Sequence, residues 1–234
     1  MLSTTTEVPA PARLPHRGSG AVLWLARHAK VHEDWHGKAY GSLDVPLSAA
    51  GTERTAVFGA ALATLAPAAV HSSPLQRARL LGERVATLGK LHLQLDDRLR
   101  EIDRGRWQGL AVEELHARHA DEVRAFYADP WSFREHGGEN DAAVFERAAS
   151  VVHEATAELG SGATLVLTSH YNVIRVLLTT ALGLPPARSF GLRLDPAHAA
   201  VLRDGPHGWE LVHTNVDAPP LPLDESQTPG AKAP

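Results

Sequence analysis

Two histidines that each follow a short apolar segment are the residues best placed for chemistry. His28 comes directly after Arg27 at the end of the segment 21–27, and His170 comes shortly after the segment 163–168. Apolar segments of this length are typical of buried strands in a mainly parallel sheet. Because ligands bind beyond the carboxyl ends of such strands, we expect both imidazoles to lie at one site.

Further charged residues suit the same site. Arg77 lies in the first turn of a helix expected to start at Pro74, where free N–H groups favour an anion. Glu101 lies in a loop, and Asp103 is an alternative carboxylate nearby. A neutral imidazole can attack phosphorus, fixed cations can stabilise the phosphoryl oxygens, and a carboxylic acid can protonate the leaving oxygen. This set of residues therefore indicates phosphoryl transfer.

The elements that must position these residues alternate between strands and helices. We expect strands at 21–27, 68–72, 91–95, 163–168, 190–194, 199–203 and 209–213. We expect helices at 49–65, 74–89 (with Ser73 as its N-cap and Pro74 at its first position), 112–125, 141–159 and 172–182. The alternation predicts an α/β fold, a three-layer α/β/α sandwich with a mainly parallel central sheet.

One domain is expected between two irregular ends. Residues 1–18 are rich in Thr, Pro and Ala without periodicity and are predicted to be a flexible leader, and the Pro-rich residues 217–234 a flexible tail. The domain then covers 19–216. Within it, the irregular stretch of about 98–140 is expected to form a lid over the site.

Composition excludes several classes of function. The chain has 234 residues, of which 44% are hydrophobic and 21% charged, as is usual for a globular domain. A net charge of −4 gives no basic surface for nucleic acid. There is no cysteine and no apolar run long enough to cross a membrane, and we expect no signal peptide. We expect a cytoplasmic protein with a small-molecule partner. The sequence does not decide between a monomer and a homodimer.

Fourteen histidines require that a metal site be considered. His28, His32 and His36 have the spacing of one helix face. Gly37 and Gly41 and the preceding strand argue against a helix at this point, so we expect no metal ion and no other cofactor.

Six motifs, in order along the chain, resemble those of the histidine phosphatase superfamily, which has the phosphoglycerate-mutase-like fold. The resemblance covers roughly 21–215. The motifs are RHA at 27–29, GSLDVPLSAAG at 41–51, SSPLQRA at 72–78, Glu101 with GRWQG at 105–109, GGEN at 137–140 with Arg147, and SHYNVIR at 169–175.

The resemblance implies a role for each matching residue. His28 would be the nucleophile that becomes phosphohistidine, and Arg27, Arg77 and His170 would hold the phosphate. Glu101 would donate a proton to the leaving group and then act as the base for water. The implied activity is hydrolysis of small organic phosphate monoesters. Arg79 and Arg175 are interpreted instead as surface or packing arginines.

The chain departs from the family pattern beside the site. Val31 lacks the hydroxyl that many members carry there, and Asp34 stands where many have Asn. Lys38 replaces a frequent Arg and could neutralise Asp34. Tyr171 replaces a frequent Gly and should narrow the pocket. These differences leave the residues of the implied phosphoryl transfer unchanged, but they affect which substrate the pocket accepts.

The substrate pocket is expected to contain further residues beside the phosphate site. The expected pocket residues are Lys38, Tyr40, Gly41, Trp107 and Tyr171. Aromatic side chains expected around the mouth are Trp107, Tyr127, Trp131, Phe133 and Tyr171. Aromatic walls suit a leaving group with an apolar or ring face, although some of these side chains could simply pack the lid.

Two other functions compete with a phosphatase. A phosphoglycerate-type mutase would carry a longer insert than the stretch 110–136, whose shortness favours the phosphatase. A non-catalytic phosphate-binding module would not need the complete set of histidines, arginines and carboxylate.

Overall fold

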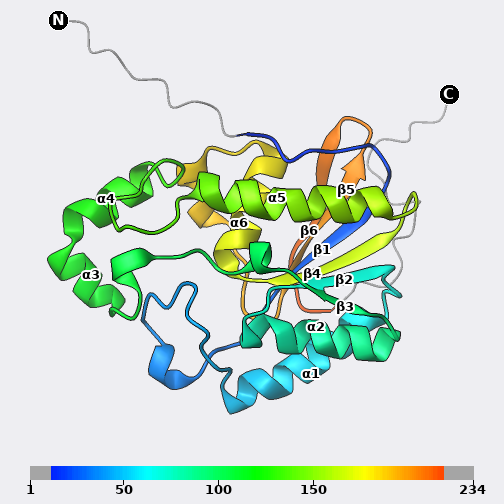
Figure 1. The fold of residues 1–234 in the computed structure, drawn as a ribbon, viewed down its shortest axis with the longest axis horizontal. Coiled ribbons are helices and arrows are strands. Elements are labelled where there is room, and N and C mark those ends of the chain that lie inside the picture. Colours follow the sequence, from blue (N-terminus) through cyan, green and yellow to red (C-terminus); the bar gives the residue numbers. More distant parts are fainter. Residues whose placement is uncertain (1–11, 219–234) are drawn as a thin grey trace, which may run out of the picture.

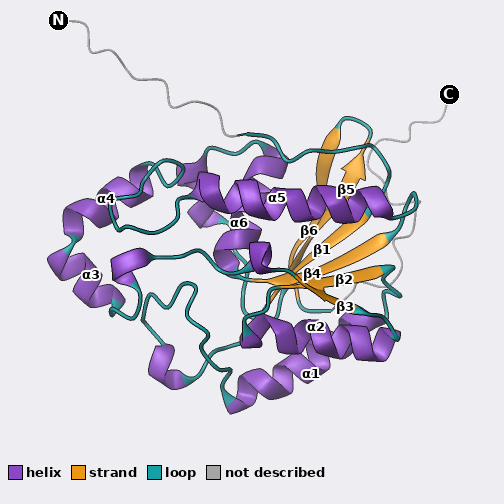
Figure 2. Cartoon of the chain, viewed as in Figure 1, coloured by secondary structure: helices purple, strands orange, loops and turns teal. Residues whose placement is uncertain are grey.

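The computed structural model describes residues 12–218, so the predicted leader up to residue 11 and the predicted tail from residue 219 lie outside the described residues. Its central element is a six-stranded sheet in the order β3-β2-β4-β1-β5-β6 (Figure 2). The strands are β1 (Val22–Arg27), β2 (Ala69–Ser72), β3 (Leu93–Leu95), β4 (Thr164–Ser169), β5 (Ala199–Gly205) and β6 (Gly208–Val216). The first four are parallel to one another, and β5 runs antiparallel both to its neighbour β1 and to its neighbour β6.

Helices cover both faces of the sheet, which confirms the predicted three-layer sandwich (Figure 1). The helices are α1 (Ala49–Ala63) and α2 (Gln76–Gly89) on one face, and α5 (Asp141–Glu158) and α6 (Tyr171–Leu182) on the other. Successive side chains of a strand point to opposite faces. In β1, Leu23 and Leu25 pack with α5 and α6, whereas Trp24 and Ala26 pack with α1 and α2. A strand covered on both faces is apolar throughout, which explains the continuous apolar run.

The register of β1 and β4 brings the two candidate histidines together. Arg27 pairs with Ser169 at the carboxyl ends of the two strands. The backbone N–H of His28 donates to the carbonyl of Ser169 at 3.1 Å. His28 and His170 therefore leave adjacent strands at the same edge, as predicted.

The lid contains short helices with a small apolar core of their own. The predicted helix 112–125 is instead two helices, α3 (Val112–Arg118) and α4 (Ala120–Ala128), which meet at His119 (φ −126°, ψ 30°). The buried side chains of this core are Trp107, Leu115, Val123, Phe126 and Phe133. The helices α3 and α4 lie beyond the carboxyl ends of the parallel strands (Figure 1).

Two predicted elements are wrong in detail. The predicted strand 190–194 is a short 3-10 helix (Pro186–Gly191) followed by extended chain. Helix α2 starts at Gln76 rather than at Pro74, and Leu75 is its N-cap. The hydroxyl of Ser73, predicted to cap this helix, lies 2.8 Å from Nε2 of His170. The segment before α2 therefore contributes to the site.

Residues 12–18, assigned to the leader, pack against the domain. The side chain of Leu14 is buried. Trp209 donates its indole N–H to the carbonyl of Pro15 at 2.9 Å. The backbone N–H groups of Arg17 and Gly18 donate to the carboxylate of Asp204. The packed domain therefore begins before residue 19.

Candidate active site

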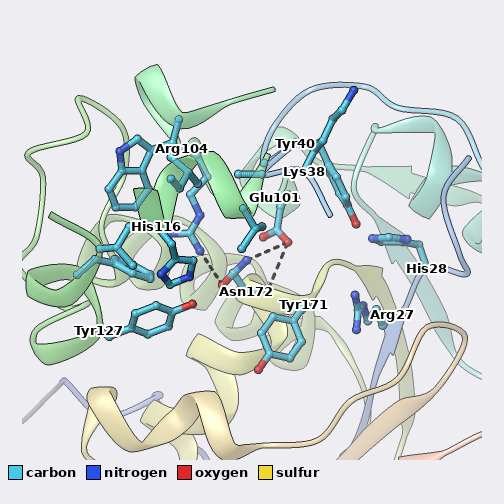
Figure 3. A pocket seen from close by; sticks show the side chains of 17 residues that line it. Arg27, His28, Lys38, Tyr40, Glu101, Arg104, His116, Tyr127, Tyr171 and Asn172 are labelled. Atoms are coloured by element: carbon cyan, nitrogen blue, oxygen red, sulfur yellow. Dashed lines mark hydrogen bonds between the residues drawn. The ribbon is translucent and has the colours of Figure 1, made fainter. Parts of the chain in front are cut away.

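A cavity of about 250 Å³ lies at the carboxyl end of β1 and beneath the lid (Figure 3). Eight of the predicted site residues line it, namely Arg27, His28, Lys38, Tyr40, Gly41, Glu101, Trp107 and Tyr171. Arg77 and His170 are fully buried and do not line this cavity. The volume is at the small end for ligand sites, so the cavity suits a small molecule.

His28 has the tautomer and charge state of a nucleophile. Its side chain is 2% exposed, and its Nδ1 lies 2.7 Å from the carbonyl oxygen of Ala29. A carbonyl only accepts, so Nδ1 carries the hydrogen and Nε2 keeps its lone pair. Burial, followed by the positive charges of Arg77 and Arg27, holds the pKa of His28 well below its usual value. The ring is therefore neutral at pH 7.

His170 faces His28 across the site. The two ring centroids are 5.2 Å apart. Nε2 of His170 lies 2.8 Å from the hydroxyl of Ser73, and Nδ1 is buried without a partner. Burial, and then the charge of Arg77, lowers the pKa of His170 well below its usual value. His170 is thus a neutral hydrogen-bonding group beside His28.

The two predicted phosphate-binding arginines are held differently. Arg27 donates from Nη1 to the carbonyl of Leu194 at 2.6 Å, and its guanidinium lies 5.2 Å from the ring centroid of Tyr171. Arg77 donates to the carbonyls of Leu43 at 2.6 Å and Gly41 at 2.8 Å. Arg27 therefore borders the cavity directly, whereas Arg77 fixes the loop at Gly41 and contributes charge from behind it.

Glu101, and not Asp103, lies in the main cavity. Oε1 of Glu101 accepts from the backbone N–H of Ile102 at 2.9 Å, and Oε2 accepts from the backbone and side-chain N–H groups of Asn172, both at 3.3 Å. Asp103 accepts from the backbone of Gly105 at 2.7 Å in the adjoining loop. The structure thus separates the two candidate carboxylates.

The pairing of Asp34 with Lys38 that the sequence left open is not formed. Asp34 lies 3.3 Å from Nδ1 of His32, and the ammonium of Lys38 lies 5.5 Å from the ring centroid of Trp35. Lys38 points away from the centre of the cavity (Figure 3). Asp34 is exposed and contributes no wall of the cavity.

Tyr40 lies between Arg77 and the cavity. The guanidinium of Arg77 is 5.2 Å from its ring centroid. Burial raises the pKa of Tyr40, so its hydroxyl keeps its proton and can donate a hydrogen bond. Its hydroxyl points toward His28 in Figure 3.

Only some of the predicted aromatic residues reach the cavity. Trp107, Tyr127 and Tyr171 line it. Phe133 packs against Trp107 within the lid, with centroids 5.7 Å apart, and Trp131 packs against Phe145 on α5 at 5.8 Å. Phe133 therefore follows the alternative that some of these side chains pack the lid, and Trp131 packs against α5 instead of lining the cavity.

Three polar residues of the cavity, Asn172, Arg104 and His116, were not predicted from the sequence. Asn172, at the start of α6, donates to Glu101 and accepts from Nη2 of Arg104 at 3.0 Å. Arg104 comes three residues after Glu101 and lines the cavity. The position of Asn172, two residues after His170, could have indicated that Asn172 lies at the site. Nothing in the sequence distinguishes Arg104 from the other arginines of the lid.

Within 12–218, no group of three or more His, Cys, Asp or Glu side chains could hold a metal ion. His32 and His36, which share a spacing with His28, are exposed on a loop. No helix in this range is both long and apolar enough to cross a membrane.

Comparison with known proteins gives one consistent family. A family model described as the histidine phosphatase superfamily (branch 1) matches residues 23–217. Phosphoserine phosphatase 1 of Hydrogenobacter thermophilus is 28% identical over 180 residues, which are 77% of this chain and 85% of that protein. A protein named probable phosphoglycerate mutase, from Salmonella paratyphi C, is 29% identical over 175 residues, covering 74% of this chain and 80% of that protein. The solved structure of a mycobacterial glucosyl-3-phosphoglycerate phosphatase matches with a TM-score of 0.74 at 27% identity, over 84% of this chain and 99% of that chain.

Proposed function

Because the chain belongs to the histidine phosphatase superfamily (branch 1) and is a phosphoric monoester hydrolase, we propose that it hydrolyses small organic phosphate monoesters through a phosphohistidine at His28. The family predicted from the six motifs is thereby confirmed. The relatives named as phosphatases are named for phosphoserine and glucosyl-3-phosphoglycerate, both phosphate monoesters, which supports this substrate class.

The observation that carries the proposal is the free Nε2 of His28. The carbonyl of Ala29 holds the hydrogen on Nδ1, and the low pKa of His28 keeps the ring neutral. In the first step Nε2 forms a bond to phosphorus, and the bond from phosphorus to the ester oxygen breaks. Arg27 borders the site of the developing phosphoryl charge, and Arg77 adds positive charge from behind.

Glu101 completes the proton transfers. In its protonated form it gives its proton to the departing ester oxygen, which leaves as an alcohol. The resulting carboxylate accepts N–H groups at the start of α6, where negative charge is favoured. Water then attacks phosphorus, the bond to Nε2 breaks with its electron pair returning to the ring, and Glu101 takes the proton of the water.

Trapping of the intermediate tests the mechanism. After brief mixing with substrate carrying labelled phosphate, the denatured protein should retain label that is labile in acid and stable in base. His28→Ala should keep the fold by circular dichroism and lose both the label and turnover. Normal turnover by His28→Ala would exclude this mechanism.

A phosphoglycerate-type mutase is the second candidate, supported by the similarity to the Salmonella protein of that name. Both activities begin with the same phosphohistidine, so they differ in whether water or a second substrate oxygen receives the phosphoryl group. We also propose a cytoplasmic location, supported by the lack of cysteine. A homodimer stays a prediction, which light scattering after size-exclusion chromatography can test.

A further inference from the structure

The end of the cavity far from His28 has no part in the mechanism above. Arg104, on the loop after Glu101, lies there with His116 of α3 and Tyr127 of α4 (Figure 3). His28 lies at the opposite end, and Glu101 lies between the two ends (Figure 3). A substrate whose phosphate contacts His28 would therefore extend its alcohol part past Glu101 toward Arg104.

The guanidinium of Arg104 is incompletely paired. Nη2 donates to Oδ1 of Asn172 at 3.0 Å, whereas Nη1 is buried without any hydrogen-bond acceptor. Burial lowers the pKa of Arg104, and the negative charge of Glu101 only partly offsets this effect. A buried donor without an acceptor is unfavourable. An anionic ligand at this end of the cavity would supply the missing acceptor and charge.

The surroundings of Arg104 indicate the kind of anion. The guanidinium lies 4.6 Å from the ring centroid of Phe126, and the apolar side chains of Leu115 and Val123, which cluster with Phe126, also line the cavity. His116 and Tyr127 provide polar groups at the same end. A guanidinium matches the planar geometry of a carboxylate. The apolar walls and a volume of about 250 Å³ leave little room for a larger hydrated anion.

We propose that Arg104 binds a carboxylate on the alcohol part of the substrate, so that the preferred substrates are phosphate monoesters of small hydroxy acids. This inference rests on the proposed function, which places the phosphate at His28. Asn172 accepts from Arg104 and donates to Glu101. A carboxylate held by Arg104 therefore also fixes the leaving oxygen relative to Glu101.

Two substrates of equal carbon number test the inference. 3-Phosphoglycerate carries a carboxylate, and glycerol 3-phosphate does not. We expect the wild-type protein to show a higher kcat/KM for phosphate release from 3-phosphoglycerate. Arg104→Met should reduce the ratio of the two kcat/KM values by about 10- to 100-fold, the range for a hydrogen-bonded charge pair. Arg104→Lys keeps the charge without the planar geometry and should reduce the ratio less.

Arg106 provides a matched control on the same loop. Its guanidinium is partly exposed and pairs with Glu122 and the carbonyl of Glu135, outside the cavity. Arg106→Met should leave the substrate ratio unchanged. If circular dichroism shows that Arg104→Met does not fold, Arg104→Lys alone tests the inference, and its ratio of the two kcat/KM values should still be below that of the wild type.

The outcomes separate this inference from the proposed function. Equal kcat/KM for the two esters in the wild type, or an equal loss on both esters in the Arg104 variants, would overturn the role of Arg104 while phosphohistidine formation still stands. Failure of the wild type to label His28 or to release phosphate from any ester would instead overturn the proposed function, and this inference with it.

Discussion

At the residue scale, the environments of Glu101 and Asp103 distinguish two carboxylates that are only two positions apart. Glu101 is 5% exposed, lines the cavity and contacts the start of α6. Asp103 accepts a hydrogen bond from Gly105 and supports the turn of its own loop. A general acid must reach the leaving oxygen, and of these two side chains only Glu101 borders the cavity that contains His28.

Glu101→Gln should slow the reaction in proportion to the need of the leaving group for a proton. An alkoxide is a poor leaving group, whereas p-nitrophenolate leaves readily without protonation. We therefore expect the loss of kcat/KM to be larger on glycerol 3-phosphate than on p-nitrophenyl phosphate by roughly 10²-fold, the low end of general-acid effects. Steady-state kinetics on both esters measure this difference.

Asp103→Asn is the control, because it makes the same chemical change outside the cavity. Asp103→Asn should change kcat/KM only slightly, and by the same factor on both substrates. Equal slowing of both substrates by Glu101→Gln would mean that Glu101 positions the site without donating a proton. A leaving-group dependence in Asp103→Asn would show that Asp103 is the acid.

Residues to which a motif gives a role were predictable from the sequence, whereas the contact between Arg104 and Asn172 was not, although Asn172 lies within the motif 169–175. His28, Arg27 and Glu101 each lie in a motif, and the structure places all three at one cavity. Arg104 and Asn172 are joined by a hydrogen bond between a lid loop and α6, 68 positions apart. Such a contact depends on the packed position of the lid, which no local pattern specifies.

At the element scale, hydrophobic periodicity predicted the buried strands and the long helices well. It failed where tertiary contacts override local preference. The predicted helix 112–125 breaks at His119, because α3 and α4 turn to bury Leu115 and Val123 in one lid core. Of the segment 190–194, Phe190 packs against the lid core and lies 4.3 Å from the Arg175 guanidinium, whereas Leu192 and Leu194 pack with the main core.

The buried ion pair between Asp141 and Arg175 joins the first turn of α5 to α6. The two carboxylate oxygens lie 2.6 and 2.7 Å from the guanidinium, and neither side chain is exposed by more than 1%. Removal of one charge leaves the other buried without a partner. Asp141→Asn should therefore lower the free energy of unfolding by about 3–5 kcal/mol, as measured by urea denaturation.

Glu83→Gln removes a carboxylate from a matched pair at the surface. Glu83 lies 3.4 Å from Arg79 on α2, and the side chains of Arg79 and Glu83 are 42% and 44% exposed. The change in unfolding free energy should stay within about 1 kcal/mol. Similar small changes in both variants would contradict a structural role for the buried pair. The interpretation of Arg79 as a surface arginine and of Arg175 as a packing arginine agrees with these positions.

At the scale of the whole molecule, His28 borders two cavities. The first lies beneath the lid and contains Glu101 and Arg104. The second, of about 380 Å³, lies on the side of the exposed residues Lys30 and His36. Tyr40 lines both. Water can therefore approach His28 from the second cavity while the alcohol part of the substrate occupies the first.

Access of water to the phosphohistidine favours hydrolysis over isomerisation. A mutase must keep its intermediate from water until the phosphoryl group returns to a second oxygen of the bound molecule. The short lid and the second cavity provide no such exclusion. With 3-phosphoglycerate and a bisphosphate primer, we expect phosphate release to be much faster than formation of 2-phosphoglycerate, both followed by phosphorus NMR. His28→Ala should show neither reaction, which controls for contaminating enzymes. Isomerisation faster than phosphate release would identify the protein as a mutase and would mean that the lid closes further when substrate binds.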